Sequence, residues 1–303
     1  MQVCRCWSRL LNQHQFVSGA LLIVSAELMF AFMGASIRQV SVDLNNGMVV
    51  FGRNLVGLVL VFTLASSAGL GNLRTRVPHL HLLRASAGLG AMYCFFYAIA
   101  HMALADAMLL KLTAPLFMPL VALFWLDERF TWHVIAALTI GFGGVGLILL
   151  PDFGDMAPVA MIALLGGLLA AVAKVTVRRL SASEPTARIV FYFAAIGTLF
   201  SLLPLAWLWQ APTQEQLMWL GILGLFATAG QLLLTRGMAC APAARLAPFT
   251  FFAVVFGAIL GWLLWDELLK WTTMAGTLLI MLSALLVSRG LAQRPVVAAE
   301  AET

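Results

Sequence analysis

Charge is what this sequence has least of. Only 10% of its 303 residues are Asp, Glu, Lys or Arg, whereas 62% are hydrophobic. A water-soluble protein of this length carries roughly 25% charged and about 45–50% apolar residues. A single soluble core cannot enclose so much hydrocarbon. We therefore predict a polytopic membrane protein, which excludes a soluble enzyme and gives the net charge of +5 no role in nucleic-acid binding.

Motifs for cofactors and catalysis are also missing. No His-Glu-x-x-His, Gly-x-Ser-x-Gly or Gly-rich Lys-Ser/Thr segment occurs, and the five histidines fall at predicted termini, loops or span ends. The four cysteines, Cys4, Cys6, Cys94 and Cys240, show no paired spacing for a disulfide or a metal. We expect no catalytic residue, no metal and no cofactor. An intramembrane enzyme is a hypothesis that the sequence does not favour.

Apolar runs divide the chain into ten segments long enough to cross a bilayer as helices. A span needs about 20 apolar residues, and only helices satisfy the backbone in lipid when no closed barrel is formed. The predicted fold class is all-α, with spans at 18–37, 47–68, 82–100, 104–126, 132–150, 157–177, 187–208, 216–237, 243–265 and 271–288. The first segment has no short apolar core with a cleavage site, so we interpret it as a retained span.

Lys and Arg are distributed unevenly between the predicted loops. With the N-terminus in the cytoplasm, the cytoplasmic segments hold ten of these cations, and the opposite side holds Arg38 and Lys270. Cytoplasmic loops carry such an excess. We predict that both tails, 1–17 and 290–303, are cytoplasmic. Eight tryptophans near span ends fit the aromatic belt of a membrane protein.

The two halves of the chain resemble each other. "WLDERFTW" (125–132) aligns with "LWDELLKW" (264–271) at an offset of 139, which matches Glu128 with Glu267. Each half contains five predicted spans, and since five is odd, the second half must insert upside down. Inverted repeats are typical of secondary transporters. We predict two five-helix repeats, 18–150 and 157–289.

The span count and the repeat carry a resemblance to a known family. "ALADAMLLKLTAPLFMPLVALFWLDE" (103–128) and "APAARLAPFTFFAVVFGAILGWLLWDE" (241–267) resemble the corresponding segments of the EamA-type drug/metabolite transporter superfamily. The resemblance implies a ten-helix bundle with a central substrate cavity that works by alternating access in a bacterial inner membrane. The second half departs from the pattern at Val254, which stands where the first half has Pro115. "RNLVG" (53–57) and "LRASAG" (83–88) resemble a subgroup that includes S-adenosylmethionine and organic-anion carriers.

Several ionisable residues fall inside predicted spans, where charge is costly and usually faces protein or a water-filled cavity. Glu27 lies near the middle of the first span; it can bind substrate, take up a proton, form a structural ion pair or stay neutral. Lys111 and Arg53 lie at similar depth in two other spans. They can hold a carboxylate or phosphate, or their side chains can snorkel to the interface. Lys174 and Arg236 lie near cytoplasmic helix ends, which suits lipid headgroups or an inner gate.

Uncharged polar residues add further candidates for substrate binding. Tyr93 and Tyr97 share one face of the third span, and Thr228 and Gln231 share one face of the eighth. Both pairs suit either substrate contacts or packing and hydrogen bonding between helices. The helix-bending candidates are prolines, which remove backbone donors: Pro115, Pro119 and Pro248.

The leading hypothesis is a secondary-active transporter for a small anionic or zwitterionic metabolite, such as an amino acid or carboxylate. Without an ATP-binding motif, its energy comes from a gradient or from exchange, so protons or a counter-substrate are possible partners beside the lipid bilayer. The alternatives are a passive channel, a membrane scaffold, and a carrier for amphipathic or cationic drugs. The sequence leaves the oligomeric state, the direction of transport and the exact substrate open.

Overall fold

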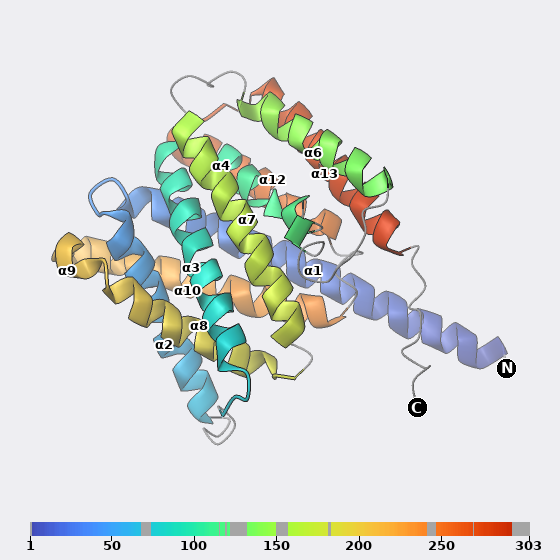
Figure 1. Ribbon diagram of the computed structural model, residues 1–303, viewed down its shortest axis with the longest axis horizontal. Helices are drawn as coiled ribbons and strands as arrows, with labels where there is room; N and C mark the ends of the chain where they lie inside the picture. Colours follow the sequence, from blue (N-terminus) through green and yellow to red (C-terminus); the bar gives the residue numbers. More distant parts are fainter. Residues whose placement is uncertain are drawn as a thin grey trace.

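The computed structural model is a bundle of helices (Figure 1). It describes residues 2–67, 74–114, 116–118, 120–121, 132–149, 157–180, 183–240, 247–268 and 270–292, and no strand occurs among them. Its helices are α1 Gln2–Val40, α2 Asn46–Ser67, α3 Pro78–His101, α4 Leu104–Lys111, α6 Trp132–Leu149, α7 Ala157–Leu180, α8 Thr186–Leu202, α9 Leu205–Leu208, α10 Gln214–Cys240, the 3₁₀ helix η3 Ala247–Phe251, α12 Phe252–Trp265 and α13 Trp271–Ala292. The predicted all-α class is confirmed.

Within the described residues, five helices contain stretches long and apolar enough to cross a membrane. They lie in α1, α2, α3, α7 and α10, and shorter apolar stretches lie in α6, α8, η3–α12 and α13. Many large apolar side chains on these helices are exposed, including Leu21 on α1 and Met161 on α7. In lipid this exposure carries no penalty. The chain is an integral membrane protein.

Three predicted boundaries differ from the structure. α1 begins at Gln2, well before the expected start of the first span at 18. The span expected at 187–208 is two helices, because α8 ends at Leu202 and Pro204 precedes α9. The span expected at 243–265 begins in the described chain with the 3₁₀ turn η3, which contains Pro248. Such turns are frequent at helix ends.

The span expected at 104–126 is not one continuous helix. α4 ends at Lys111, and Leu112 and Thr113 form a tighter turn in which their N–H groups donate to the carbonyls of Leu109 and Leu110. Pro115 follows four residues after Lys111 in the sequence. Proline has no N–H to donate to the Lys111 carbonyl, so the α-helical bonding pattern stops there. Pro115 and Pro119 themselves, like Asp127 and Glu128, lie outside the described residues.

The helix contacts come in matched pairs. α1 packs on α10, as α7 packs on α3; α2 contacts α10, as α8 contacts α3; α1 contacts α12, as α7 contacts α4. Three further contacts join corresponding spans of the two halves: α2–α8, α6–α13, and α4–α12, which belong to the spans expected at 104–126 and 243–265. If each helix is replaced by its counterpart in the other half, the same set of contacts results. Figure 1 shows α6 and α13 side by side along one edge of the bundle.

Small residues let these helices approach closely. A side chain at Gly34 of α1 would overlap Met108 of α4, and one at Gly144 of α6 would meet the Gly276 carbonyl of α13. Close approach at small residues is the usual basis of helix association in membranes. α4 is enclosed most completely, since Leu104, Met108 and Leu110 are fully buried. The centre of the bundle is thus built around this short helix.

Gly144→Ala tests the α6–α13 contact. Its new methyl group would lie 2.9 Å from a backbone oxygen, so a helix must shift. We expect a loss of about 1–3 kcal/mol of stability, the usual range for overpacking, measured as a lower unfolding temperature in detergent. Gly143→Ala is the matched control, because no atom lies within 4 Å of the added carbon. Equal effects of the two substitutions would contradict the close contact.

Candidate functional site

An ion pair lies between α1 and α4 at the centre of the bundle. Glu27 is 4% exposed, and its Oε2 lies 3.8 Å from Nζ of Lys111, at the point where α4 ends. This distance is too long for a hydrogen bond. Oε2 has no hydrogen-bond partner among the described residues. The carboxylate therefore keeps the capacity to accept a bond from a further donor.

Aromatic rings hold the Lys111 ammonium inside the bundle. Nζ lies 4.4 Å from the centroid of the Phe30 ring and 5.4 Å from that of Phe95. Both distances fit cation–π attraction. The structure thus brings together Glu27 and Lys111, two of the predicted site residues, and places the Lys111 ammonium beside Glu27. The snorkelling alternative for Lys111 does not describe this arrangement.

Lys174 joins this centre, although the sequence indicated only a position near a helix end. Its charge interacts electrostatically with Glu27, Lys111 and Arg84. Lys174 lies seven residues after Gly167, on the same face of α7, and Gly167 packs against Thr113 just after α4. That face turns into the bundle, yet Lys174 is exposed. We infer that solvent reaches it between helices.

Arg53 and Arg84 form a second cationic group, which we call the guanidinium pair. The Arg84 guanidinium carbon lies 4.1 Å from the centroid of the Phe193 ring of α8, and that of Arg53 lies 5.9 Å from the same centroid. Arg53 is 9% exposed and donates from Nη1 to Oδ1 of Asn54, at 3.0 Å. Arg53 was a predicted site residue. Arg84 was missed as an individual residue, although its segment, 83–88, carries part of the family resemblance.

The two predicted tyrosines have different surroundings. The Tyr93 side chain is half-buried, and its hydroxyl has no hydrogen-bond partner among the described residues. The Tyr97 ring stacks on the exposed His101 ring with centroids 4.0 Å apart, near the end of α3. Tyr93 thus keeps a buried polar group for a ligand or a water molecule, whereas Tyr97 is engaged by its neighbour on the same helix.

The predicted pair on α10 is turned toward neighbouring helices. The Thr228 hydroxyl donates to the carbonyl of Gly224 in its own helix, at 2.8 Å, and lies 3.6 Å from the place of a Cβ on Gly57 of α2. Gln231 is half-buried on the same helix. The hydroxyl of Thr228 is therefore used in the helix, and a role in substrate binding stays a prediction for both residues.

One end of the bundle is closed by a charged contact, and we call it the Glu267 end. Glu267 forms an ion pair with Arg38 of α1 and accepts a hydrogen bond from the backbone N–H of Leu104, at 3.0 Å. The Arg38 guanidinium also lies over the Trp265 ring. Asp266 has a positive φ of 53°, and the N–H groups of Asp266 and Glu267 cap the end of α12. This turn directs Glu267 back onto α1 and α4.

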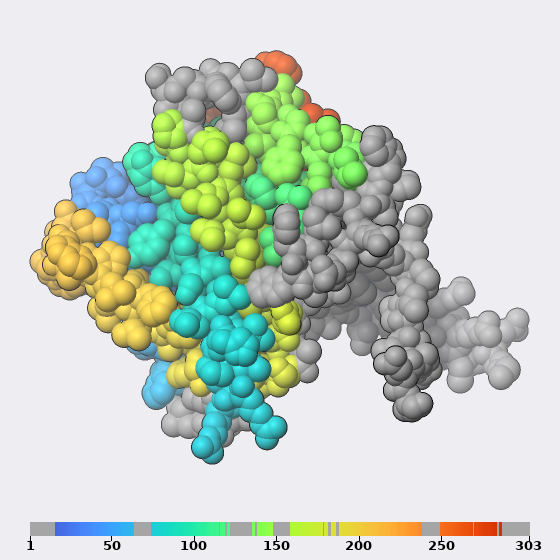
Figure 2. All heavy atoms as spheres, in the orientation of Figure 1, coloured from blue at the N-terminus to red at the C-terminus, as the bar shows by residue number. Residues whose placement is uncertain are grey.

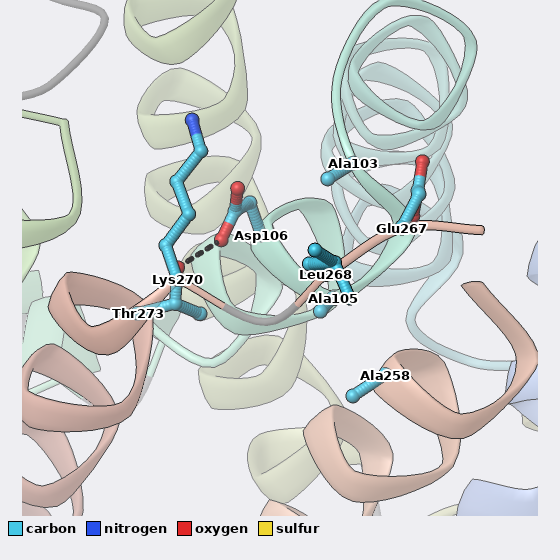
Figure 3. Close-up of a pocket in the computed structure, with 8 residues that line it drawn as sticks. All are labelled: Ala103, Ala105, Asp106, Ala258, Glu267, Leu268, Lys270 and Thr273. Atoms are coloured by element: carbon cyan, nitrogen blue, oxygen red, sulfur yellow. Dashed lines mark hydrogen bonds between the residues drawn. The ribbon is translucent and has the colours of Figure 1, made fainter. Parts of the chain in front are cut away.

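A small cavity of about 30 Å³ lies at the same end. Figure 3 shows Asp106 of α4, where it accepts a hydrogen bond from the hydroxyl of Thr273 of α13, and Glu267 at another wall of the cavity. About one water molecule would fill such a space. The contacts of Asp106 and Glu267 therefore leave no room for a metabolite to pass here.

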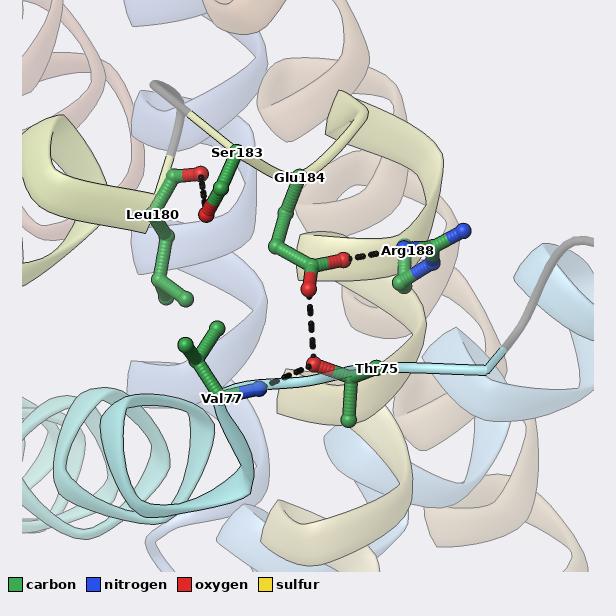
Figure 4. Close-up of polar contacts among 6 residues, drawn as sticks. All are labelled: Thr75, Val77, Leu180, Ser183, Glu184 and Arg188. Carbon is green, nitrogen blue, oxygen red and sulfur yellow. Dashed lines mark hydrogen bonds and ion pairs between the residues drawn. The ribbon is translucent and has the colours of Figure 1, made fainter.

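The opposite end, which we call the Glu184 end, has a hydrogen-bonded cluster. Figure 4 shows Glu184, before α8, between Thr75 and Arg188. The Thr75 hydroxyl donates to Glu184 at 2.7 Å and joins the segment before α3 to the segment before α8. Burial of the Glu184 carboxylate raises its pKa, but the hydrogen bonds from Thr75 and Arg188 outweigh this effect, so the pKa lies below its ordinary value. The side chain is ionised at neutral pH.

Buried charge between paired helices defines a class: an integral membrane protein with a polar centre, of the kind that transporters have. Residues 17–150 and 157–289 each match the model of the EamA-like transporter family. These two matches span most of the chain. The chain belongs to the EamA-like transporter family and is a transporter, as its resemblance to the superfamily implied.

Relatives of the chain are transporters with different substrates. It is 36% identical over 276 residues to the pseudopaline exporter of Pseudomonas aeruginosa, covering 90% of this chain and 96% of the relative. It is 24% identical over 239 residues to an S-adenosylmethionine uptake transporter of Rickettsia bellii, covering 79% and 82%. A crystal structure with 19% identity and a TM-score of 0.65 covers 92% of this chain and 99% of that protein, which supports the fold alone.

A double-mutant cycle tests the central ion pair. Lys111→Met leaves the Glu27 carboxylate buried without its partner, so we expect a loss of stability. Glu27→Gln in addition removes the orphaned charge and should restore part of the stability, with a coupling of about 1–3 kcal/mol. Unfolding temperatures of the two single variants, the double variant and the wild type in one detergent measure this coupling. Strictly additive effects would mean that the two groups do not interact.

Proposed function

We propose that this protein is a secondary transporter that moves a small anionic or zwitterionic metabolite by alternating access. The observation that carries the proposal is the Glu27–Lys111 ion pair at the centre of the bundle, with which the charge of Lys174 interacts electrostatically. Ammonium groups attract carboxylates, and the open acceptor on Glu27 suits an amino group. A membrane scaffold does not need buried charges at its centre, and the alternating access proposed here, unlike a channel, uses the paired arrangement of the two halves.

We propose further that the two matched halves are inverted repeats, 18–150 and 157–289, that exchange conformations. The matched pairs of helix contacts support this division. The two breaks support it as well, because the end of α4 at Lys111 and the change from η3 to α12 at Phe252 lie close to the offset of 139 in the aligned repeats. In this proposal Pro115, Pro119 and Pro248 permit bending of the two helices.

The two ends of the bundle supply the gates of the proposed cycle. Arg38–Glu267 joins the first half to the second at one end, and Thr75–Glu184 joins them at the other. Alternating access requires that one contact opens while the other stays closed. The positive-inside pattern of the sequence supports an orientation with the Glu267 end outside and both termini in the cytoplasm, and in this proposal the membrane is a bacterial inner membrane. Similarity to the pseudopaline exporter supports transport out of the cell.

Solute release from proteoliposomes tests the proposed function. Vesicles containing the purified protein are loaded with a mixture of small cellular metabolites, and the released solutes are identified by mass spectrometry. We expect release of anions or zwitterions by the wild type, and a loss of at least about tenfold in rate for Lys111→Ala, since a charged hydrogen bond to the solute is removed. Arg74→Gln removes an exposed cation from the segment before α3 and is the control. Selective release of cations would contradict the proposal.

Thiol labelling tests the gate at the Glu267 end. Ala105 lines the cavity there and is 6% exposed, so a cysteine in its place should react slowly with a membrane-impermeant reagent. Glu267→Gln weakens the contact with Arg38 and should raise the labelling rate severalfold from one side of the membrane. The same comparison at an exposed position, Trp209→Cys, controls for access to the reagent. An unchanged rate at position 105 would show that the Arg38–Glu267 contact does not hold this end closed.

A further inference from the structure

Hydrogen-bond donors without acceptors gather around the guanidinium pair. Nε of Arg84 and Nδ2 of Asn54 are buried and have no hydrogen-bond partner among the described residues. Within the described residues, Arg53 donates its one hydrogen bond to Oδ1 of its sequence neighbour Asn54. Asn54 is fully buried and Arg53 is nine-tenths buried. Buried polar groups are normally satisfied, and these groups can only donate. What the cluster lacks is an acceptor.

The charge balance leads to the same conclusion. Arg53, Arg84, Lys111 and Lys174 are four cations connected by electrostatic interactions, and Glu27, which interacts with Lys111 and Lys174, is the one carboxylate of this group, so the excess is 4 − 1 = 3 positive charges. No ion pair joins Arg53, Arg84 or Lys174 to a carboxylate within the described ranges. Arg84 interacts with both Arg53 and Lys174 electrostatically, which connects the guanidinium pair to the central ion pair. An uncompensated cation in a membrane is costly, so a partner from outside the chain is expected.

The packing around the guanidinium pair leaves room for these side chains. A Cβ at Gly88 of α3 would overlap both the Arg84 guanidinium and the Phe193 ring. At Gly197, one turn after Phe193 on α8, a Cβ would lie 3.5 Å from the Asn54 amide. Figure 2 shows α3 on one face of the molecule between α7 and the α8–α9 region. Three helices thus form the cluster: α2 supplies Arg53 and Asn54, α3 supplies Arg84, and α8 supplies the ring.

Phe193 positions the guanidinium groups but cannot satisfy their hydrogen bonds. A ring attracts the cation through its face and leaves the N–H groups at the edge of the guanidinium free. These N–H groups match the two oxygens of a carboxylate, which arginine can bind in a bidentate manner. The side-chain amide of Asn54 adds a donor next to them. The cluster is therefore prepared for a planar group with negative charge.

We propose that Arg53, Asn54 and Arg84 form a second substrate subsite that binds a carboxylate group, so that the transported solute carries at least two carboxylates. One carboxylate lies at this subsite and another lies at Lys111 and Lys174, while an amino group of the solute meets Glu27. This proposal rests on the proposed function and narrows its substrate class to amino acids with additional acidic groups. A mono-anion would leave the excess charge only partly compensated.

Matched acids and amides test the number of carboxylates. The probes are aspartate and asparagine, glutamate and glutamine, and 2-aminoadipate and its side-chain amide, each at millimolar concentration with the detergent-purified full chain. The two members of a pair differ by one carboxylate and have nearly the same shape. A ligand that binds only the folded state raises the unfolding temperature. We expect the acid of at least one pair to stabilise the wild type more than its amide does.

Variants at Arg84 assign that difference to the subsite. Arg84→Gln should weaken binding of the acid roughly tenfold to hundredfold and remove its advantage over the amide. Arg84→Lys keeps the charge but loses the planar donor geometry, so it should restore only part of the advantage. Gly88→Ala should act like Arg84→Gln, because its methyl group displaces the guanidinium. Arg74→Gln, which removes an exposed cation before α3, should leave the advantage unchanged.

The stability of the ligand-free variant separates binding from a structural role. Arg84→Gln removes a half-buried cation that is repelled by Arg53, so without ligand its unfolding temperature should equal or exceed that of the wild type. A clear fall would assign Arg84 to the fold and overturn the proposal. Equal stabilisation by acid and amide in all pairs, or stronger stabilisation by inorganic phosphate, would also overturn it. Metabolite release that persists in Arg84→Gln vesicles would leave the proposed function in place in either case.

Discussion

The unequal balance of charge at the centre of this bundle constrains everything around it. One carboxylate, on Glu27, interacts with Lys111 and Lys174, and two further cations, Arg84 and Arg53, extend this group inside the bundle, where each charge is costly. The chain reduces this cost with aromatic faces, Phe30 and Phe95 for Lys111 and Phe193 for the two arginines. Rings weaken the penalty without cancelling the charge. The ligand-free protein is thus held in a state of higher energy than its packing alone would give, and a bound anion would lower it.

The break after α4 shows how backbone chemistry serves this centre. Lys111 is the last residue of a helix whose other side chains are almost completely buried. Because the α-helical bonding ends there, the ammonium group is presented at a helix end, where the negative end of the helix dipole favours a cation. An uninterrupted helix would have given Lys111 only neighbouring side chains. The proline therefore contributes to the position of the charge as well as to possible bending.

Sequence patterns predicted the helices well and the polar centre only in part. Hydrophobic length locates a span, and it placed Glu27 near the middle of the first one, about two turns before Gly34, where α1 packs closely on α4. Spacing along one helix does not reveal which helix lies opposite. For this reason Lys174, near a helix end, was interpreted as a contact to lipid headgroups or an inner gate, although it faces Glu27 and Lys111. The partners of Arg53 lie on α3 and α8, and only the folded bundle brings Arg84 and Phe193 to it.

The two acidic residues of the second Asp-Glu segment, Asp266 and Glu267, have different structural roles at the turn after α12. Asp266 occupies the left-handed region of backbone space, which asparagine and glycine also tolerate, while Glu267 holds Arg38 and the Leu104 amide. Substitutions at these two adjacent positions are therefore constrained by two different requirements. Position 266 requires a residue that tolerates the left-handed backbone conformation, whatever its charge. Position 267 requires a carboxylate that can contact Arg38 and the Leu104 amide. Asp266 and Glu267 look like one acidic motif in the sequence, but each can be substituted independently of the other.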